Sequence, residues 1–376
     1  MGAKGDVILR KPIETPQVQY RKLDALNYSS IVKFEKSPVQ FFEEFILGNK
    51  PDDEDTPATL LGNIVDDVIL THQGDVEEFE QNFDERYALY DGEPSTAQAF
   101  VLAEELYRIT NHSIIDGHIT REFPETFQEA FETLQAQGKY KGKTMQQGLE
   151  DFKKVNKSGA SGETYLQAKL AALGKMVVSV GVKLKGLQIA SNALTDPFTR
   201  EYFDFHGKDE NIEKLAKFPI TFTYKGEEGE IEGKVEVDEL IINHLAKTIQ
   251  PIDLKTTYDN TQFPYGYLKN RYYLQGGWYT EAIEQWKTEN GMGDYTVLPY
   301  KFIVLDTSNN NRRPLIYKLN MTHMAGNYLG FKMGNHYYKG IKELVEAIIW
   351  SNSTGIWNIS KEAYELAGII KMPDFI

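Results

Sequence analysis

The second half of the chain carries the clearest alternation of apolar and polar positions. Three successive stretches, FPITFTY, GEIEGKVEVDELIIN and KTIQPIDLKTTY, are rich in β-branched residues and have the period of two that is typical of strands. A helix is then expected over about 264–288, followed by a strand in YTVLPYKFIVLD that RRPLIYKLN could pair with. The pattern predicts a sheet that begins near residue 218.

Helical spacing dominates the first part of the chain. In LLGNIVDDVIL the apolar residues follow the i, i+3, i+4, i+7, i+8 spacing of an amphipathic helix. Upstream, the segment 26–48 predicts a short helix capped by Ser29 or Ser30, then Pro38 and a second helix rich in aromatic residues.

One mixed α/β domain with a large helical insertion or side domain is the simplest account of these patterns. Residues 75–195 are expected to be mostly helical, with loops at 91–96 and 156–162, and 337–350 predicts another amphipathic helix. The expected parts are N-terminal helices over 1–70, a helical insertion over 71–217, a catalytic sheet over 218–320 and a helical extension over 321–376.

The composition removes several classes of chemistry. The 376 residues include no cysteine, which excludes disulfide frameworks, thiol nucleophiles, zinc ribbons and cysteine-bound iron–sulfur clusters. No apolar stretch approaches the roughly 20 residues that a membrane helix needs, and the polar N-terminus does not read as a signal peptide. A cytoplasmic protein with no membrane partner is therefore expected.

The net charge of -14 argues mildly against a nucleic-acid partner, because phosphate binding usually leaves a basic surface. A local groove can nevertheless have the opposite sign. The candidate phosphate-binding patch is a run of lysines, which comprises Lys139, Lys141, Lys143, Lys153, Lys154 and Lys157. The alternative interpretation is a solvated face of loop and helix.

A carboxylate–lysine group lies on two successive predicted strands. Asp253 and Lys255 share one face of the second strand because alternate residues of a strand point the same way. If NHLA (243–246) forms a turn, the strands are antiparallel neighbours and Asp238 can approach Asp253. Two such carboxylates repel unless a cation lies between them. Mg²⁺, which takes one or two carboxylates plus water and phosphate, suits that position.

A lysine beside such a metal completes a device for phosphodiester hydrolysis. The metal would lower the pKa of a bound water, and the Lys255 ammonium could orient that water or stabilise developing negative charge. An isolated D-x-K arises by chance in most chains of this size. The competing interpretation is a surface ion pair on an edge strand, which Pro251 would favour.

The segment VEVDELII … PIDLKTT, with YYLQGGWY after it, resembles the core of PD-(D/E)XK nucleases. The similarity is greatest to the RecB-like and RecE/lambda-exonuclease-like branch of bacteria and their phages. The D-x-K-T of that branch matches Asp253, Lys255 and Thr256, and its Q-x-x-x-Y matches Gln275 and Tyr279 on the next helix. The resemblance implies a restriction-endonuclease-like fold, a central mixed sheet flanked by helices, with Gln275 and Tyr279 supporting the site.

The resemblance also implies further metal ligands. The family's G-x-x-x-H matches Gly62 to Asp66, with aspartate in place of histidine, so Asp66 is carried over as a third oxygen ligand. The usual G-x-x-D would select Glu236, but the distance to IDLK favours Asp238, and Glu236 is the reserve. The Leu254 backbone carbonyl is a possible further ligand.

The expected function is a Mg²⁺- or Mn²⁺-dependent deoxyribonuclease, and the resemblance favours an exonuclease in phage or bacterial DNA recombination or repair. DNA is the expected partner, a single-strand annealing protein is a possible one, and the site of action would be the host cytoplasm if a phage encodes the chain. Two alternatives remain, an endonuclease or junction resolvase on the same fold and a non-catalytic DNA-binding or assembly protein. The oligomeric state and the polarity of cleavage stay open.

Overall fold

The computed structural model describes residues 24–49, 56–92, 97–112, 114–115, 118–308, 310 and 312–369. It divides into two compact units. The sheet unit consists of the described parts of 1–51 and 195–376, and the helical unit of those of 52–194. The chain is thus a mixed α/β protein, as its sequence predicts. Among the described helices, none is long and apolar enough to cross a membrane.

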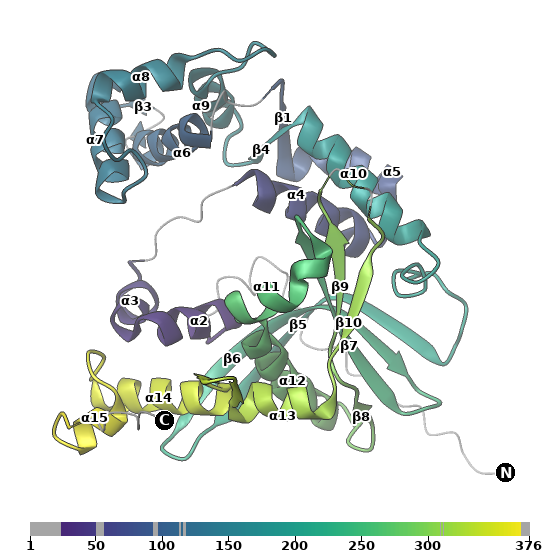
Figure 1. Ribbon diagram of the computed structural model, residues 1–376. Coiled ribbons are helices and arrows are strands. Elements are labelled where there is room, and N and C mark those ends of the chain that lie inside the picture. Colours follow the sequence, from purple (N-terminus) through teal and green to yellow (C-terminus); the bar gives the residue numbers. More distant parts are fainter. Residues whose placement is uncertain are drawn as a thin grey trace. The chain divides into compact units, whose positions relative to one another are not determined.

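One mixed sheet forms the centre of the sheet unit (Figure 1). Its strands run in the order β10-β9-β7-β6-β5, and β8 pairs with the start of β7. Their bounds are Ile212–Lys225 for β5, Glu230–Asn243 for β6, Thr248–Thr257 for β7, Thr296–Val297 for β8, Lys301–Asp306 for β9 and Leu315–Lys318 for β10. β7 is parallel to β8 and β9, and the other pairs are antiparallel. The expected strands are present and β10 pairs with β9, but the single strand expected in YTVLPYKFIVLD is two, β8 and β9.

β7 lies in the middle of the sheet, so the competing interpretation, a surface ion pair on an edge strand around Pro251, is wrong. Proline is tolerated there because the neighbour of β7 changes from β8 to β9 close to this residue. The Gln250 amide donates hydrogen bonds of 2.9 Å to the carbonyls of Pro251 and Pro299 at this junction. Hydrogen bonds from the Gln250 side chain to these two backbone carbonyls therefore take the place of a regular bond between strands.

Helices from both ends of the chain cover the sheet. α12 (Tyr272–Glu289) packs against β5 and β6, and α2 (Tyr28–Lys36) and α14 (Ile341–Thr354) pack against α12. α13 (Met321–Leu329) lies against both α12 and α14. The resulting core is aliphatic and aromatic, and Trp278 of α12 is among its largest fully buried side chains. Most of the unit's apolar burial is thus on the face that carries α12.

Gly233 is required where β6 passes beneath α12. A Cβ atom at this position would lie 2.6 Å from the Trp278 ring and 2.7 Å from the Phe222 ring. We expect Gly233→Ala to lower the free energy of unfolding by about 1–3 kcal/mol, the usual cost of overpacking a core. Chemical denaturation measures this loss. Gly293→Ala is the matched control, because its Cβ would have no neighbour within 4 Å, and equal effects of the two substitutions would contradict the packing argument.

The helix expected over 264–288 is broken in two. α11 spans Phe263–Lys269, and α12 starts after Arg271, which adopts a left-handed φ of 64°. The Arg271 side chain donates to Glu35 of α2 at 2.6 Å, and the Tyr28 hydroxyl donates to the Asn270 carbonyl at 2.5 Å. Contacts with α2, which is distant in sequence, therefore fix the position of the break. No local sequence pattern predicts it.

The first N-terminal helix begins two or three residues before the position that the sequence predicts. Asn27, not Ser29 or Ser30, caps α2, and Ser30 completes the capping box from inside the helix. Ser37 caps α3 (Pro38–Phe41), which continues as a π-helical turn over Phe42–Ile46. Near the C-terminus, α14 begins at Ile341 rather than 337, since β12 (His336–Tyr338) pairs with β11 (Phe331–Met333).

The helical unit contains α4 and the segments up to α10. Its helices are α4 (Pro57–Asp66, continued by a π-helical turn Asp67–Thr71), α5 (Val76–Arg86), α6 (Ala97–His112), α7 (Phe123–Ala136), α8 (Met145–Lys153), α9 (Gly162–Ala171) and α10 (Val180–Thr195). Two short strand pairs accompany them, β1 (Tyr87–Tyr90) with β4 (Met176–Ser179) and β2 (Ile114–Ile115) with β3 (His118–Ile119). Strands this short leave no recognisable alternation, so the sequence did not predict them.

The compact units divide the chain at different places from the expected parts. The boundaries fall at 51/52 and 194/195 instead of 70/71 and 217/218. α4 therefore groups with the helical unit, although the sequence assigned it to the nuclease core. β5 extends back to Ile212 because its first residues pair with the end of β6.

Candidate functional site

The two predicted carboxylates lie where β6 and β7 separate. The antiparallel ladder runs from Asn243↔Thr248 to Glu239↔Ile252, and its register would next place Asp238 opposite Asp253. At that point Asp238 Oδ2 accepts a hydrogen bond of 2.9 Å from the Leu254 backbone N–H. A side chain thus takes the place of a ladder bond, and the regular pairing of β6 with β7 ends beside both carboxylates.

Asp253 is held by two of the predicted residues. Its side chain is 0 % exposed, and Gln275 of α12 donates to its Oδ1 atom. The Lys255 ammonium lies 2.5 Å from Oδ2 and 5.1 Å from the centre of the Tyr272 ring. The D-x-K spacing on β7 and the first turn of α12 therefore bring Asp253, Lys255 and Gln275 together.

The charges of the site are unequal. Burial raises the pKa of Asp253 to about 6, against the attraction of Lys255, and the Asp238 charge adds to the rise. Burial also acts on Asp238, but Lys217, Lys255 and the Leu254 N–H hold its pKa below the usual value. The pKa of Lys255 is raised despite burial, because Asp253 and Asp238 are close. Of the two predicted carboxylates, Asp253 is therefore the one whose charge is less compensated.

Lys217 belongs to the site although the sequence reasoning did not select it. It lies on β5 directly across from Asp238, between the pairs Ala216↔Glu239 and Phe218↔Val237. Its ammonium donates to Asp238 Oδ1 at 3.0 Å. The strand was expected to begin at residue 218, which left Lys217 one position outside it. The register of the β5–β6 hairpin is the signal that could have found it.

Tyrosines lie on the α12 side of the carboxylates. Tyr279, one turn after Gln275, meets Tyr300 edge-on, with ring centroids 6.4 Å apart. Tyr300 is fully buried, and its hydroxyl has no hydrogen-bond partner among the described residues. Burial and then the Asp253 charge raise the Tyr300 pKa well above its usual value. Tyr279 thus reaches the site by packing on a buried phenol.

Glu239 adds a third acidic residue to this part of β6 but little charge. It is fully buried, and neither carboxylate oxygen has a hydrogen-bond partner in the part of the chain that the structure describes. Burial raises its pKa to about 8. Near neutral pH the residue is therefore mainly protonated, and Asp238 and Asp253 set the negative charge of the site.

Two further predicted ligands, Leu254 and Glu236, lie on β7 and β6 respectively. Leu254 directs its N–H toward β6, and in an extended strand its carbonyl faces the same way, toward the gap beside Asp238. Glu236 lies opposite Pro219, two residues before Asp238. The register thus places Asp238, not Glu236, opposite Asp253.

Asp66 is the last residue of α4, in the helical unit. The next residue, Asp67, is buried and accepts hydrogen bonds from Arg86 and Tyr87. Asp66 itself is half-buried. Of the two adjacent aspartates, Asp67 therefore has an evident structural role in this unit.

The predicted lysine patch also lies in the helical unit. Lys143 pairs with Asp151 at 2.5 Å and donates to the Gln98 side chain at 2.7 Å, so intramolecular contacts occupy its ammonium. The other lysines of the run are exposed, namely Lys139, Lys141, Lys153, Lys154 and Lys157. Apart from Lys143, the run remains a candidate for phosphate contact.

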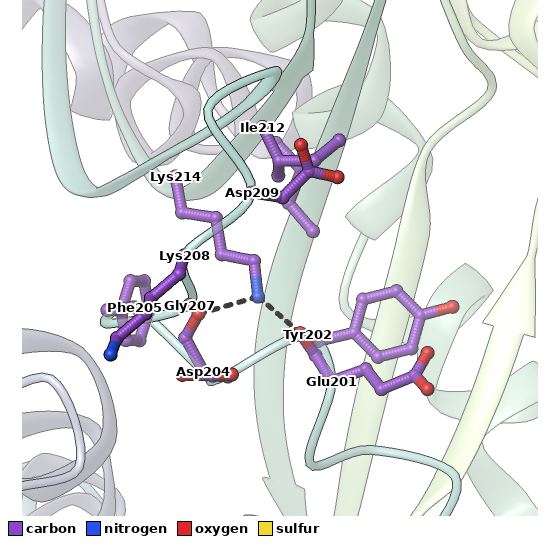
Figure 2. A pocket seen from close by; sticks show the side chains of 10 residues that line it. Glu201, Tyr202, Asp204, Phe205, Gly207, Lys208, Asp209, Ile212 and Lys214 are labelled. Carbon is purple, nitrogen blue, oxygen red and sulfur yellow. Dashed lines mark hydrogen bonds between the residues drawn. The ribbon is translucent and has the colours of Figure 1, made fainter.

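A separate pocket of about 490 Å³ opens beside β5 (Figure 2). Lys214 crosses it and donates to the backbone carbonyls of Asp204, at 2.8 Å, and Glu201. The ammonium therefore anchors the 201–209 loop. The residues found to line this pocket include none of Asp238, Asp253 or Lys255, so the carboxylate–lysine group stands apart from it.

The carboxylate–lysine group fits a hard divalent cation. Asp238 and Asp253 supply carboxylate oxygens next to the end of the β6–β7 pairing, and burial, with a smaller contribution from the Asp238 charge, raises the pKa of Asp253, a penalty on its charged form that a bound cation would offset. Within the described ranges, no three His, Cys, Asp or Glu side chains gather as a metal site. Such an ion would thus use both carboxylates and complete its shell with backbone, water and phosphate oxygens, a common arrangement for Mg²⁺.

Comparison with known proteins adds no family to this description. No protein-family model matches the chain, and no curated protein matches it.

Proposed function

We propose that this protein is a metal-dependent DNA nuclease with a restriction-endonuclease-like core of the PD-(D/E)XK type. One observation carries the proposal. Asp238 and Asp253 lie next to the end of the β6–β7 pairing, while Lys255 and Gln275 both contact Asp253. An ion pair that served stability alone would gain little from complete burial of its carboxylate, as at Asp253, whereas a hydrolytic site needs desolvated, fixed charges.

Each residue of the site has one proposed role. Asp238, Asp253 and the Leu254 carbonyl would hold Mg²⁺ or Mn²⁺, with Glu236 in reserve. When bound, the ion lowers the pKa of a coordinated water and offsets phosphate charge. Lys255 orients the attacking water and stabilises negative charge on the phosphate oxygens. Gln275 fixes the Asp253 carboxylate through its hydrogen bond, and Tyr279 packs against the buried ring of Tyr300.

The nuclease is tested with end-labelled linear DNA and a covalently closed circle of the same sequence, each with and without Mg²⁺. An exonuclease degrades the linear DNA only when the metal is present and leaves the circle intact. Cutting of the circle would instead establish an endonuclease or resolvase. No cleavage of either substrate with Mg²⁺ or Mn²⁺ would refute the nuclease.

A second candidate function is a non-catalytic DNA-binding protein that retains this fold. One observation favours it: protein donors contact all four oxygens of Asp238 and Asp253. In such a protein, the side-chain and backbone donors would fill the former metal site, and this relic site would no longer bind a divalent ion. Calorimetry with Mn²⁺ separates the two readings, since a relic site should bind no divalent ion in the millimolar range that nucleases use.

A further inference from the structure

Two lysines, not one, neutralise the carboxylates of this site. Lys255 contacts Asp253, and its position suits the hydrolysis proposed above. Lys217 instead contacts Asp238 Oδ1, and the proposed reaction gives it no role. The second oxygen of Asp238 is already bound by the Leu254 N–H. The Lys217 ammonium therefore occupies the oxygen of Asp238 that faces away from this backbone bond.

The backbone at Lys217 is shaped for this contact. Its φ of +48° is left-handed, a conformation that residues other than glycine rarely adopt, yet regular pairs flank it on both sides. Core residues change phase at this point of both strands. The pair Phe218↔Val237 faces the core on one side of the change, and the pair Leu215↔Leu240 faces it on the other. An unusual conformation enforced by its surroundings is a sign of a functional constraint.

We propose that Lys217 is a resident counter-ion, which holds Asp238 in place without metal and competes with the divalent cation for Oδ1. The inference rests on the proposed function. An ammonium 3.0 Å from Oδ1 occupies the space that a coordinated ion and its water shell need. Like charges that close repel strongly, so the cation binds only as Lys217 withdraws. The lysine stem, with four rotatable carbons, allows this movement.

The charge balance indicates what Lys217 does next. Without metal, two ammonium groups match two carboxylates. A divalent ion then leaves the site positive, a state that an anionic phosphodiester relieves. Lys217 thereby makes metal binding weak alone and stronger with DNA, so that the loaded site assembles on its substrate.

Titration calorimetry with MnCl₂ alone tests the competition. Lys217→Met keeps the length of the side chain and removes its charge, and it should bind Mn²⁺ about tenfold more tightly than the wild type, as expected for removal of a like charge at this distance. Lys217→Arg keeps the charge and should bind as the wild type does. The control is Lys225→Met at the exposed end of β5, which should leave the affinity unchanged.

A merely structural lysine predicts the opposite result, because losing it would loosen Asp238 and weaken Mn²⁺ binding. Equal or weaker binding by Lys217→Met, with the wild type binding normally, overturns the role of Lys217 and leaves the nuclease standing. If neither protein binds Mn²⁺, both the metal site and the competition are refuted. Thermal melting checks that the variants fold, and Lys217→Gln replaces Lys217→Met if the latter does not.

Discussion

Lys255→Ala should lose at least about a thousandfold in the rate of DNA cleavage, the upper part of the range for removing a positioned charge or proton-transfer group. The ammonium lies against Asp253, where it can orient water and balance the phosphate in the transition state. These interactions strengthen only as the reaction proceeds, so the affinity for DNA should change little. Single-turnover cleavage of linear DNA and a separate binding assay in Ca²⁺ measure the two quantities.

The control for this substitution is Lys225→Ala, since Lys225 lies on the same sheet but at the exposed end of β5. It should cleave at the wild-type rate. If Lys255→Ala cleaves as fast as the wild type, the proposed mechanism is wrong. If it loses DNA binding as severely as cleavage, Lys255 contributes to binding and not to the chemical step.

Asp253→Asn should abolish metal-dependent cleavage. The stability of this variant relative to the wild type should also increase as the pH rises from acid to alkaline values. Burial raises the pKa of Asp253 from 3.8 to about 6 in the folded protein. The folded state therefore favours the protonated acid. That contribution to stability is fully present below pH 3.8 and is lost as the pH rises through about 6. An uncharged asparagine avoids this loss.

The stability difference between Asp253→Asn and the wild type is consequently expected to shift in favour of the variant between pH 4 and pH 8, by up to about 3 kcal/mol. Urea denaturation at both values of pH measures it. A shift in the opposite direction would mean that Lys255 overcompensates the burial of Asp253. Asp84→Asn, on an exposed part of α5, is the control and should show no comparable shift.

Local sequence determined the strands and one half of the site. Alternation with period two predicted β6, β7 and β9, because side chains on a strand point alternately to its two faces. The same geometry places Asp253 and Lys255 together, and the short turn after Asn243 makes β6 and β7 antiparallel neighbours. These relations span few residues, so pattern alone could predict them. The contact between Gln275 and Asp253 was expected only from the resemblance to a nuclease family.

Tertiary structure alone decided the rest. β7 is central because β9, some 50 residues later, pairs along its other side, and no local pattern distinguishes that from an edge. Arg271 ends the expected helix because it meets Glu35 of α2. Lys217 reaches Asp238 only through the register and the left-handed turn of β5. In each case, contacts with residues distant in sequence stabilise the observed arrangement. The local sequence determines only which face of each strand or helix is apolar.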